Sequence, residues 1–114
     1  MKLLPLALAL VCACDGGSQL TGEVRDPAGN PVPEATVTLA AVYNDTQIDS
    51  VTEPTGAVGG FSVHILHSPF GSQPLRLSVR KAGYRSYDLE FTAGHLPPVP
   101  IRVVLVPEKV GGAR

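Results

Sequence analysis

Apolar and polar residues alternate with a period of two along most of the chain, most clearly over residues 20–41. The apolar positions of this segment are Leu20, Gly22, Val24, Val37, Leu39 and Ala41. Such alternation is typical of half-buried β-strands. Between the two alternating stretches lies Asp26-Pro27-Ala28-Gly29, with Asp, Pro and Gly where a type I turn favours them. The segment therefore predicts an antiparallel β domain.

The same alternation recurs at five further places, and no segment shows a sustained helical period of 3.6. Seven strands are expected, over about residues 19–25, 35–43, 47–52, 61–65, 75–80, 87–91 and 101–106. The third is the weakest and is expected at a sheet edge. In Ala82-Gly83-Tyr84 a tight turn is expected, with Gly83 free to adopt a positive φ. Seven short strands separated by turn signals predict an all-β sandwich.

Composition narrows the classes of function. The 114 residues are enough for one domain, and 44% hydrophobic with 17% charged residues suits a globular chain. The formal net charge is −1 and no basic stripe is present, so a nucleic-acid partner is not expected. With no Trp, three Tyr and three Phe, an aromatic platform for sugars or bases would have few rings.

The amino-terminal segment 1–13 has the features of a secretory signal peptide. Lys2 supplies the positive charge, and the apolar stretch 3–11 is too short to span a bilayer. The run Val11-Cys12-Ala13-Cys14 resembles a bacterial lipobox, in which the cysteine after a small residue is acylated and becomes the first residue. That resemblance implies lipidation at Cys14 and attachment to the membrane of the bacterial cell envelope, on the periplasmic or the cell-surface side.

Two alternatives remain open for this segment. An ordinary signal peptide could be cut near Gly16, which would leave the protein secreted or periplasmic. Cys12 and Cys14 could form a redox or metal pair, although their spacing is tighter than that of a CxxC motif. In the lipoprotein interpretation, residues 14–19 form a tether, residues 20–107 the domain and residues 108–114 a loose tail.

Five runs together resemble the carboxypeptidase regulatory-like domain family over about residues 20–106. They are Gly22-Glu23-Val24-Arg25-Asp26, Gly29-Asn30-Pro31-Val32-Pro33-Glu34-Ala35-Thr36-Val37, Gly60-Phe61-Ser62-Val63, Arg80-Lys81-Ala82-Gly83-Tyr84 and Val103-Val104-Leu105. The resemblance implies a transthyretin-like, seven-stranded Greek-key β-sandwich. It implies an accessory module beside peptidases, receptors or surface proteins, without the zinc site or catalytic carboxylate of an attached carboxypeptidase.

Two positions depart from the family pattern. Glu34 stands where the family commonly has Gly before Ala35. The family's short T-D-x-x-G-x-F link is expected to be stretched here over residues 52–61, with a loop over 53–60.

The candidate chemistry is sparse. His64 and His67 are three residues apart, so their rings should diverge from a strand, and His95 lies in a Gly/Pro loop. No G-x-S-x-G nucleophile motif is present. Hydroxyisourate hydrolases share a transthyretin-like fold, but segment 108–114 does not match their Tyr-Arg-Gly-Ser type of ending. We therefore expect no enzyme activity, no catalytic or metal-binding residue and no cofactor.

The remaining candidates lie on the strands. Three arginines, Arg76, Arg80 and Arg102, project from one class of strand faces with Asp88 and Glu90 nearby. They either form cross-strand charge pairs or offer a surface for an anionic ligand. Tyr84 and Tyr87 are expected to pack at the core and its rim. Val104 and Val106 mark either a second buried face or a partner-binding patch.

The sequence thus predicts a non-enzymatic binding or structural module, anchored to the envelope membrane through Cys14, with a protein or polysaccharide partner. The alternative is a secreted or periplasmic module that docks on a separate enzyme or receptor. A small transthyretin-like hydrolase is the third candidate.

Overall fold

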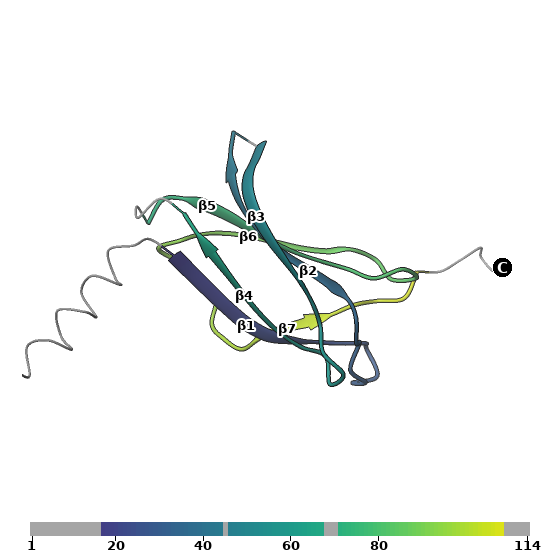
Figure 1. Ribbon diagram of the computed structural model, residues 1–114. Coiled ribbons are helices and arrows are strands. Elements are labelled where there is room, and N and C mark those ends of the chain that lie inside the picture. The colour runs from purple at the N-terminus through teal and green to yellow at the C-terminus, as the bar shows by residue number, and fades with distance from the viewer. Residues whose placement is uncertain (1–16, 45, 68–70, 109–114) are drawn as a thin grey trace, which may run out of the picture.

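The computed structural model describes residues 17–44, 46–67 and 71–108, which form seven strands in two sheets (Figure 1). The strands are β1 (Gly17–Arg25), β2 (Thr36–Tyr43), β3 (Thr46–Pro54), β4 (Gly60–Leu66), β5 (Pro74–Arg80), β6 (Tyr87–Thr92) and β7 (Ile101–Val104). The described residues contain no helix. The all-β sandwich is confirmed, while the Greek-key connection pattern stays a prediction.

The strand order is β4-β1-β7 in one sheet and β3-β2-β5-β6 in the other. β3 lies at a sheet edge, as expected. One strand pair corrects the antiparallel expectation, because β1 and β7 are parallel, with Gly22 opposite Ile101. The reason is the chain path: residues 93–100 cross from the end of β6 to the other sheet, and β7 then runs in the same direction as β1.

The core lies between the sheets and is made by alternate residues of the strands. Its fully buried side chains include Leu20, Val24, Val37, Leu39, Val63, Ile65, Leu75, Leu77, Val79 and Val103. Full burial of such a side chain stabilises the fold by about 1.5–3 kcal/mol. The predicted inward and outward alternation is therefore confirmed in β1, β4, β5 and β7. In β2 it holds only over residues 36–39, because Ala40, expected to face outward, is buried along with both of its neighbours.

The turn chemistry expected between β1 and β2 is present. The backbone N–H of Gly29 donates to the carbonyl of Asp26 at 2.9 Å, and Gly29 has a φ of +92°. The carboxylate of Asp26 accepts hydrogen bonds from the N–H groups of Ala28 and Asn30, each at 2.9 Å. The expected positive φ at Gly83 is also observed, at +88°.

The expected tether overlaps the first strand. β1 begins at Gly17, and residues 17–19 pair with residues 64–66 of β4. Ser18 is buried, and its hydroxyl lies 2.7 Å from Nε2 of His67. The pairing extends this far because β4 continues to Leu66 and provides backbone partners for three more residues. Only Asp15 and Gly16 then separate Cys14 from the sheet.

The link between β3 and β4 is short, which corrects the expectation of a stretched loop. β3 continues to Pro54, and a turn closes between Gly56 and Gly59 through a 2.9 Å backbone bond. Counted from Thr55, the segment to Phe61 has the spacing T-x-x-x-G-x-F, so it has the family length. The first threonine of the pattern is thus Thr55 rather than Thr52, and Gly56 stands where the pattern has Asp.

The carboxyl-terminal part of the domain remains tied to the sandwich beyond β7. Leu105 is buried and donates its N–H to Arg25. The N–H of Arg85 bonds to Val106 at 2.8 Å, and the N–H of Glu108 bonds to Gly83 at 2.9 Å. Glu108, expected in the tail, is therefore held by the β5–β6 turn, while residues 109–114 lie outside the described residues.

Candidate functional site

The outer face of the four-stranded sheet carries a polar ladder across β5 and β6. Arg76 and Glu90 are opposite each other in register, and both Nε and NH2 of the arginine contact Oε2 of the glutamate, at 2.9 and 2.8 Å. Farther along the same two strands, NH2 of Arg80 lies 3.3 Å from Oδ1 of Asp88. The interpretation of these residues as cross-strand charge pairs is confirmed. Pairs at such exposed positions contribute only about 0.2–1 kcal/mol each.

The carboxyl group of Asp88 has a pKa below its ordinary value. The hydroxyl of Ser78, directly opposite on β5, donates a 2.7 Å hydrogen bond to its Oδ1. This bond, followed by the positive charge of Arg80, holds the pKa of Asp88 below its ordinary value of 3.8, although partial burial acts in the opposite direction. The ladder therefore stabilises a charged carboxylate, which is the opposite of what a general acid requires.

The three arginines do not form one surface. Arg102 lies on β7 in the three-stranded sheet, opposite Glu23 of β1, whereas Arg76 and Arg80 belong to the four-stranded sheet. All three lie on outer strand faces, as expected, but on different sheets, because alternation assigns a residue to the outside of a sheet and does not say which sheet. An anionic-ligand surface built from all three is excluded by this placement.

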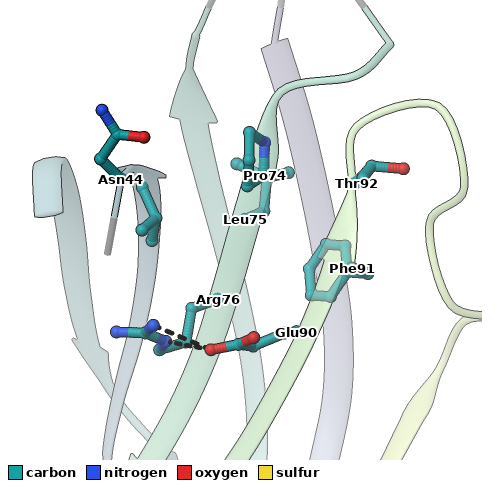
Figure 2. A pocket seen from close by; sticks show the side chains of 8 residues that line it. Asn44, Pro74, Leu75, Arg76, Glu90, Phe91 and Thr92 are labelled. Atoms are coloured by element: carbon teal, nitrogen blue, oxygen red, sulfur yellow. Dashed lines mark hydrogen bonds and ion pairs between the residues drawn. The ribbon is translucent and has the colours of Figure 1, made fainter. Parts of the chain in front are cut away.

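A shallow concavity of about 430 Å³ lies where β5 begins and β6 ends, and it is drawn in Figure 2. Its lining residues are Val42, Asn44, Pro74, Leu75, Arg76, Glu90, Phe91 and Thr92. Figure 2 shows the Arg76–Glu90 pair on one side and Pro74 and Thr92 on the other. Because the two charged groups neutralise each other, the concavity suits a small, largely apolar group better than an ion.

The histidines are dispersed, as their spacing predicts. His64 is exposed on the outer face of β4, and His67 lies beyond the end of that strand against Ser18. His95 lies with Nδ1 3.5 Å from the hydroxyl of Thr92, too long to activate a nucleophile, which needs a base within about 2.6–3.2 Å. Within residues 17–44, 46–67 and 71–108, no group of three His, Cys, Asp or Glu side chains could hold a metal ion.

The other candidates have simple roles. Tyr84 and Tyr87 pack against the core, as expected. Val104 and Val106 are 51% and 42% exposed, so they do not form a second buried face and remain candidates for a partner-binding patch. Cys14 and Cys12 lie outside the described residues.

The residue that the sequence analysis missed is Thr55. It is one of two buried polar residues among those described, and its hydroxyl holds the backbone of the β1–β2 connection. Its role is structural. The signal that could have found it is the T-x-x-x-G-x-F spacing from Thr55 to Phe61.

Comparison with protein families identifies the domain. The model of the carboxypeptidase regulatory-like domain matches residues 19–106. The chain belongs to this family. Its domains are in general non-catalytic β-sandwich modules, which agrees with a surface of paired charges and dispersed histidines. The resemblance drawn from the sequence motifs is thereby confirmed.

Comparison with solved structures gives a similarity of fold. The chain is similar to 3-chlorocatechol 1,2-dioxygenase from Rhodococcus opacus 1CP, with a TM-score of 0.57 and 14% identity. The similarity covers 81% of this chain and 60% of the dioxygenase chain, so this protein spans only part of that enzyme. At this identity the likeness concerns the fold alone. The comparison with curated proteins gives no significant match.

Proposed function

We propose that this protein is a non-enzymatic accessory module of the bacterial cell envelope, attached to a membrane through acylated Cys14. The observation that carries the proposal is the position of Cys14. It follows the apolar stretch 3–11 and a small residue, Ala13, and it lies three residues before the first strand of the domain. A folded module placed directly after such a cysteine would be held close to the membrane by the acyl chains.

The surface of the domain supports a binding or structural role. The charged side chains of the β5–β6 ladder are paired with one another, and the described histidines do not converge. The module would then act through contact with a protein or polysaccharide at the envelope. Among the described residues, there is no helix with the length and apolar character needed to cross a bilayer.

Metabolic labelling with a palmitate analogue tests the anchor. We expect label on the wild type and on Cys12→Ala, and no label on Cys14→Ala. An unlabelled wild type would contradict the anchor, and label that depended on Cys12 instead would move it to the other cysteine. Two or three acyl chains are needed for stable attachment, because a single chain binds a membrane only marginally.

A second candidate is a secreted or periplasmic module that docks on a separate enzyme or receptor. Its support is the exposed pair Val104 and Val106, of which Val104 lines a concavity of about 540 Å³ beside Arg102. Co-purification from the native envelope with Val104→Ser, compared with Val58→Ser, tests this candidate. Loss of one defined partner only in the Val104 variant is the expected result.

A further inference from the structure

One end of the sandwich contains Gly17, the described residue that follows Cys14 most closely in the sequence. It comprises the described segments 17–19, 43–44, 46–48, 64–67 and 71–74, and is called the Gly17 end below. Gly17 pairs with Leu66 at the end of β4, and the side-chain amide of Gln73 bonds to the carbonyl of Val42 at 3.1 Å. Figure 1 shows the start of β1, the end of β4 and the start of β5 on the left, with the β2–β3 hairpin projecting at the top.

This end exposes several large apolar side chains to solvent. Three of the four most exposed large hydrophobic side chains of the described residues lie here: Tyr43 at 64%, Leu66 at 61% and Ile48 at 59%. The fourth, Val58, lies in the β3–β4 turn at the opposite end of the sandwich. Exposed apolar side chains gathered at one end mark a contact surface rather than random exposure.

Ile48 lies at a β-bulge of the edge strand β3, whose residues 46–49 are all exposed. Ala41 of β2 is opposite Asp49, whereas the next residue, Val42, is opposite Gln47, so Ile48 is the extra residue of β3. A bulge re-aims side chains and interrupts the regular alternation. Leu66 lies next to Gly17, the first described residue. A Cβ placed on Gly17 would be 3.4 Å from Cδ2 of Leu66.

The same end carries no charge in its described segments. None of the residues in these five segments is Lys, Arg, Asp or Glu, although the chain has 19 such residues in all (nine basic and ten acidic). The nearest acidic residues of the hairpin are Asp49 and Asp45, and Asp45 lies outside the described residues. Contact with a low-dielectric surface therefore desolvates no ionic group of these segments, which removes the largest cost of such contact.

The chain length to Cys14 determines which surface this end meets. Asp15 and Gly16 are the two residues between Cys14 and Gly17, so even a fully extended chain places Gly17 within about 11 Å of the acylated cysteine. The headgroup region of one leaflet is about 6 Å thick. The Gly17 end is thus held beside the headgroups, and this contact is intramolecular once the anchor is inserted, so weak contacts suffice.

We infer that the Gly17 end rests on the phospholipid surface, with the side chains of Tyr43, Ile48 and Leu66 inserted at the headgroup–acyl boundary. This inference rests on the proposed lipid anchor and deepens it by assigning the orientation of the domain. Tyrosine suits this position because its ring is apolar and its hydroxyl is polar. Since the described part of this end has no Lys or Arg, the contact is mainly apolar and should not require anionic lipid or low salt.

The chain has no tryptophan, so a single Trp can report its own depth. The full chain, acylated in a bacterial host, is reconstituted into phosphatidylcholine vesicles whose acyl chains are brominated, and Trp quenching is measured for Ile48→Trp and Leu66→Trp. Val58→Trp is the matched control, because position 58 is at least as exposed as positions 48 and 66 but lies at the far end. We expect several-fold stronger quenching at positions 48 and 66 than at 58, unchanged at high salt.

The outcomes separate the two proposals. If the protein floats with the vesicles and all three variants are quenched equally, the anchor stands and the orientation is wrong. Stronger quenching at position 58 also overturns the orientation. If the wild type does not float with the vesicles, both the anchor and the orientation fall. Circular dichroism of each variant checks that the β-sandwich is retained.

Discussion

The hydroxyl of Thr55 accepts a 2.8 Å hydrogen bond from the backbone N–H of Ala35, across the gap between two connections of the sandwich. The same hydroxyl donates to the carbonyl of Val32 at 2.7 Å. The backbone of Thr55 also bonds to Glu34 and Ala35, at 3.0 and 2.9 Å. With Thr55 at 3% exposure, these bonds are shielded from water and hold the β1–β2 connection to the β3–β4 link.

We expect Thr55→Val to lower the free energy of unfolding by at least about 2 kcal/mol, because it leaves a buried donor and a buried acceptor unpaired. Chemical denaturation measures the change. Thr55→Ser is the matched control, since it keeps the hydroxyl and removes one methyl group, worth about 0.8 kcal/mol. Equal losses in the two variants would show that the hydroxyl does not stabilise the fold.

Glu34 adopts a φ of +59°, in the left-handed region where a side chain is unfavourable. This is the position at which the family commonly has Gly. We expect Glu34→Gly to raise the free energy of unfolding by about 1 kcal/mol, because glycine adopts this conformation without steric cost. Thermal unfolding measures the gain. Glu34→Ala controls for loss of the carboxylate, and a gain as large as that of glycine would contradict the conformational explanation.

The turns at Asp26 and Gly56 share a hydrogen-bonding pattern. In each turn, the backbone N–H of the first residue donates to the carbonyl of the residue four positions later. The carbonyl of the first residue accepts a hydrogen bond from the N–H of a glycine three positions later, and this glycine has a positive φ. Only the first turn has a carboxylate that caps further N–H groups. A Cβ on Gly56 would have nothing nearer than the Gly60 carbonyl at 4.0 Å, so a side chain fits there.

We therefore expect Gly56→Asp to raise the free energy of unfolding, with a cap contribution of about 0.5–1.5 kcal/mol. Gly56→Ala serves as the control, because it restricts the unfolded chain in a similar way but supplies no acceptor. The difference between the two variants in urea denaturation isolates the cap. A variant with Asp that is no more stable than the one with Ala would refute the equivalence of the two turns.

Ser78 holds the pKa of Asp88 below its ordinary value. The stabilisation from this group is full above the ordinary pKa of about 3.9 and is lost as the pH falls through the lower, folded-state pKa. We expect Ser78→Ala to raise the pKa of Asp88 and to flatten the dependence of stability on pH below about 4. The side chain is 47% exposed, so the effect on stability should be small.

Carboxyl-carbon NMR titration of Asp88 measures this change directly. Thr38→Ala provides the control, because it removes a hydroxyl from the same sheet face whose partner is Thr52. An Asp88 pKa that responded equally to both variants would mean that the Ser78 bond is not its main determinant.

Much of the fold follows from local pattern. The core strands were predictable because a half-buried strand must place alternate side chains in the core, and Phe61, Val63 and Ile65 do so. The third strand was the weakest prediction, since none of its side chains is fully buried. The turns at Gly29 and Gly83 were predictable because few residues other than glycine adopt a positive φ cheaply. Family membership followed from the same residues, since its motifs are these turns and strand starts.

Features that depend on how distant segments meet were not predictable in this way. Alternation places Arg76 and Arg102 on outer faces, but only the pairing of strands puts them on different sheets. The parallel pairing of β1 with β7 and the extension of β1 to Gly17 depend on which neighbour supplies backbone partners. Local alternation was enough to predict the buried side of β1, β4, β5 and β7, because it is a property of neighbouring residues. The tertiary structure alone decided which polar groups of Thr55, Ala35 and Val32 meet, because hydrogen bonds join atoms that are far apart along the chain.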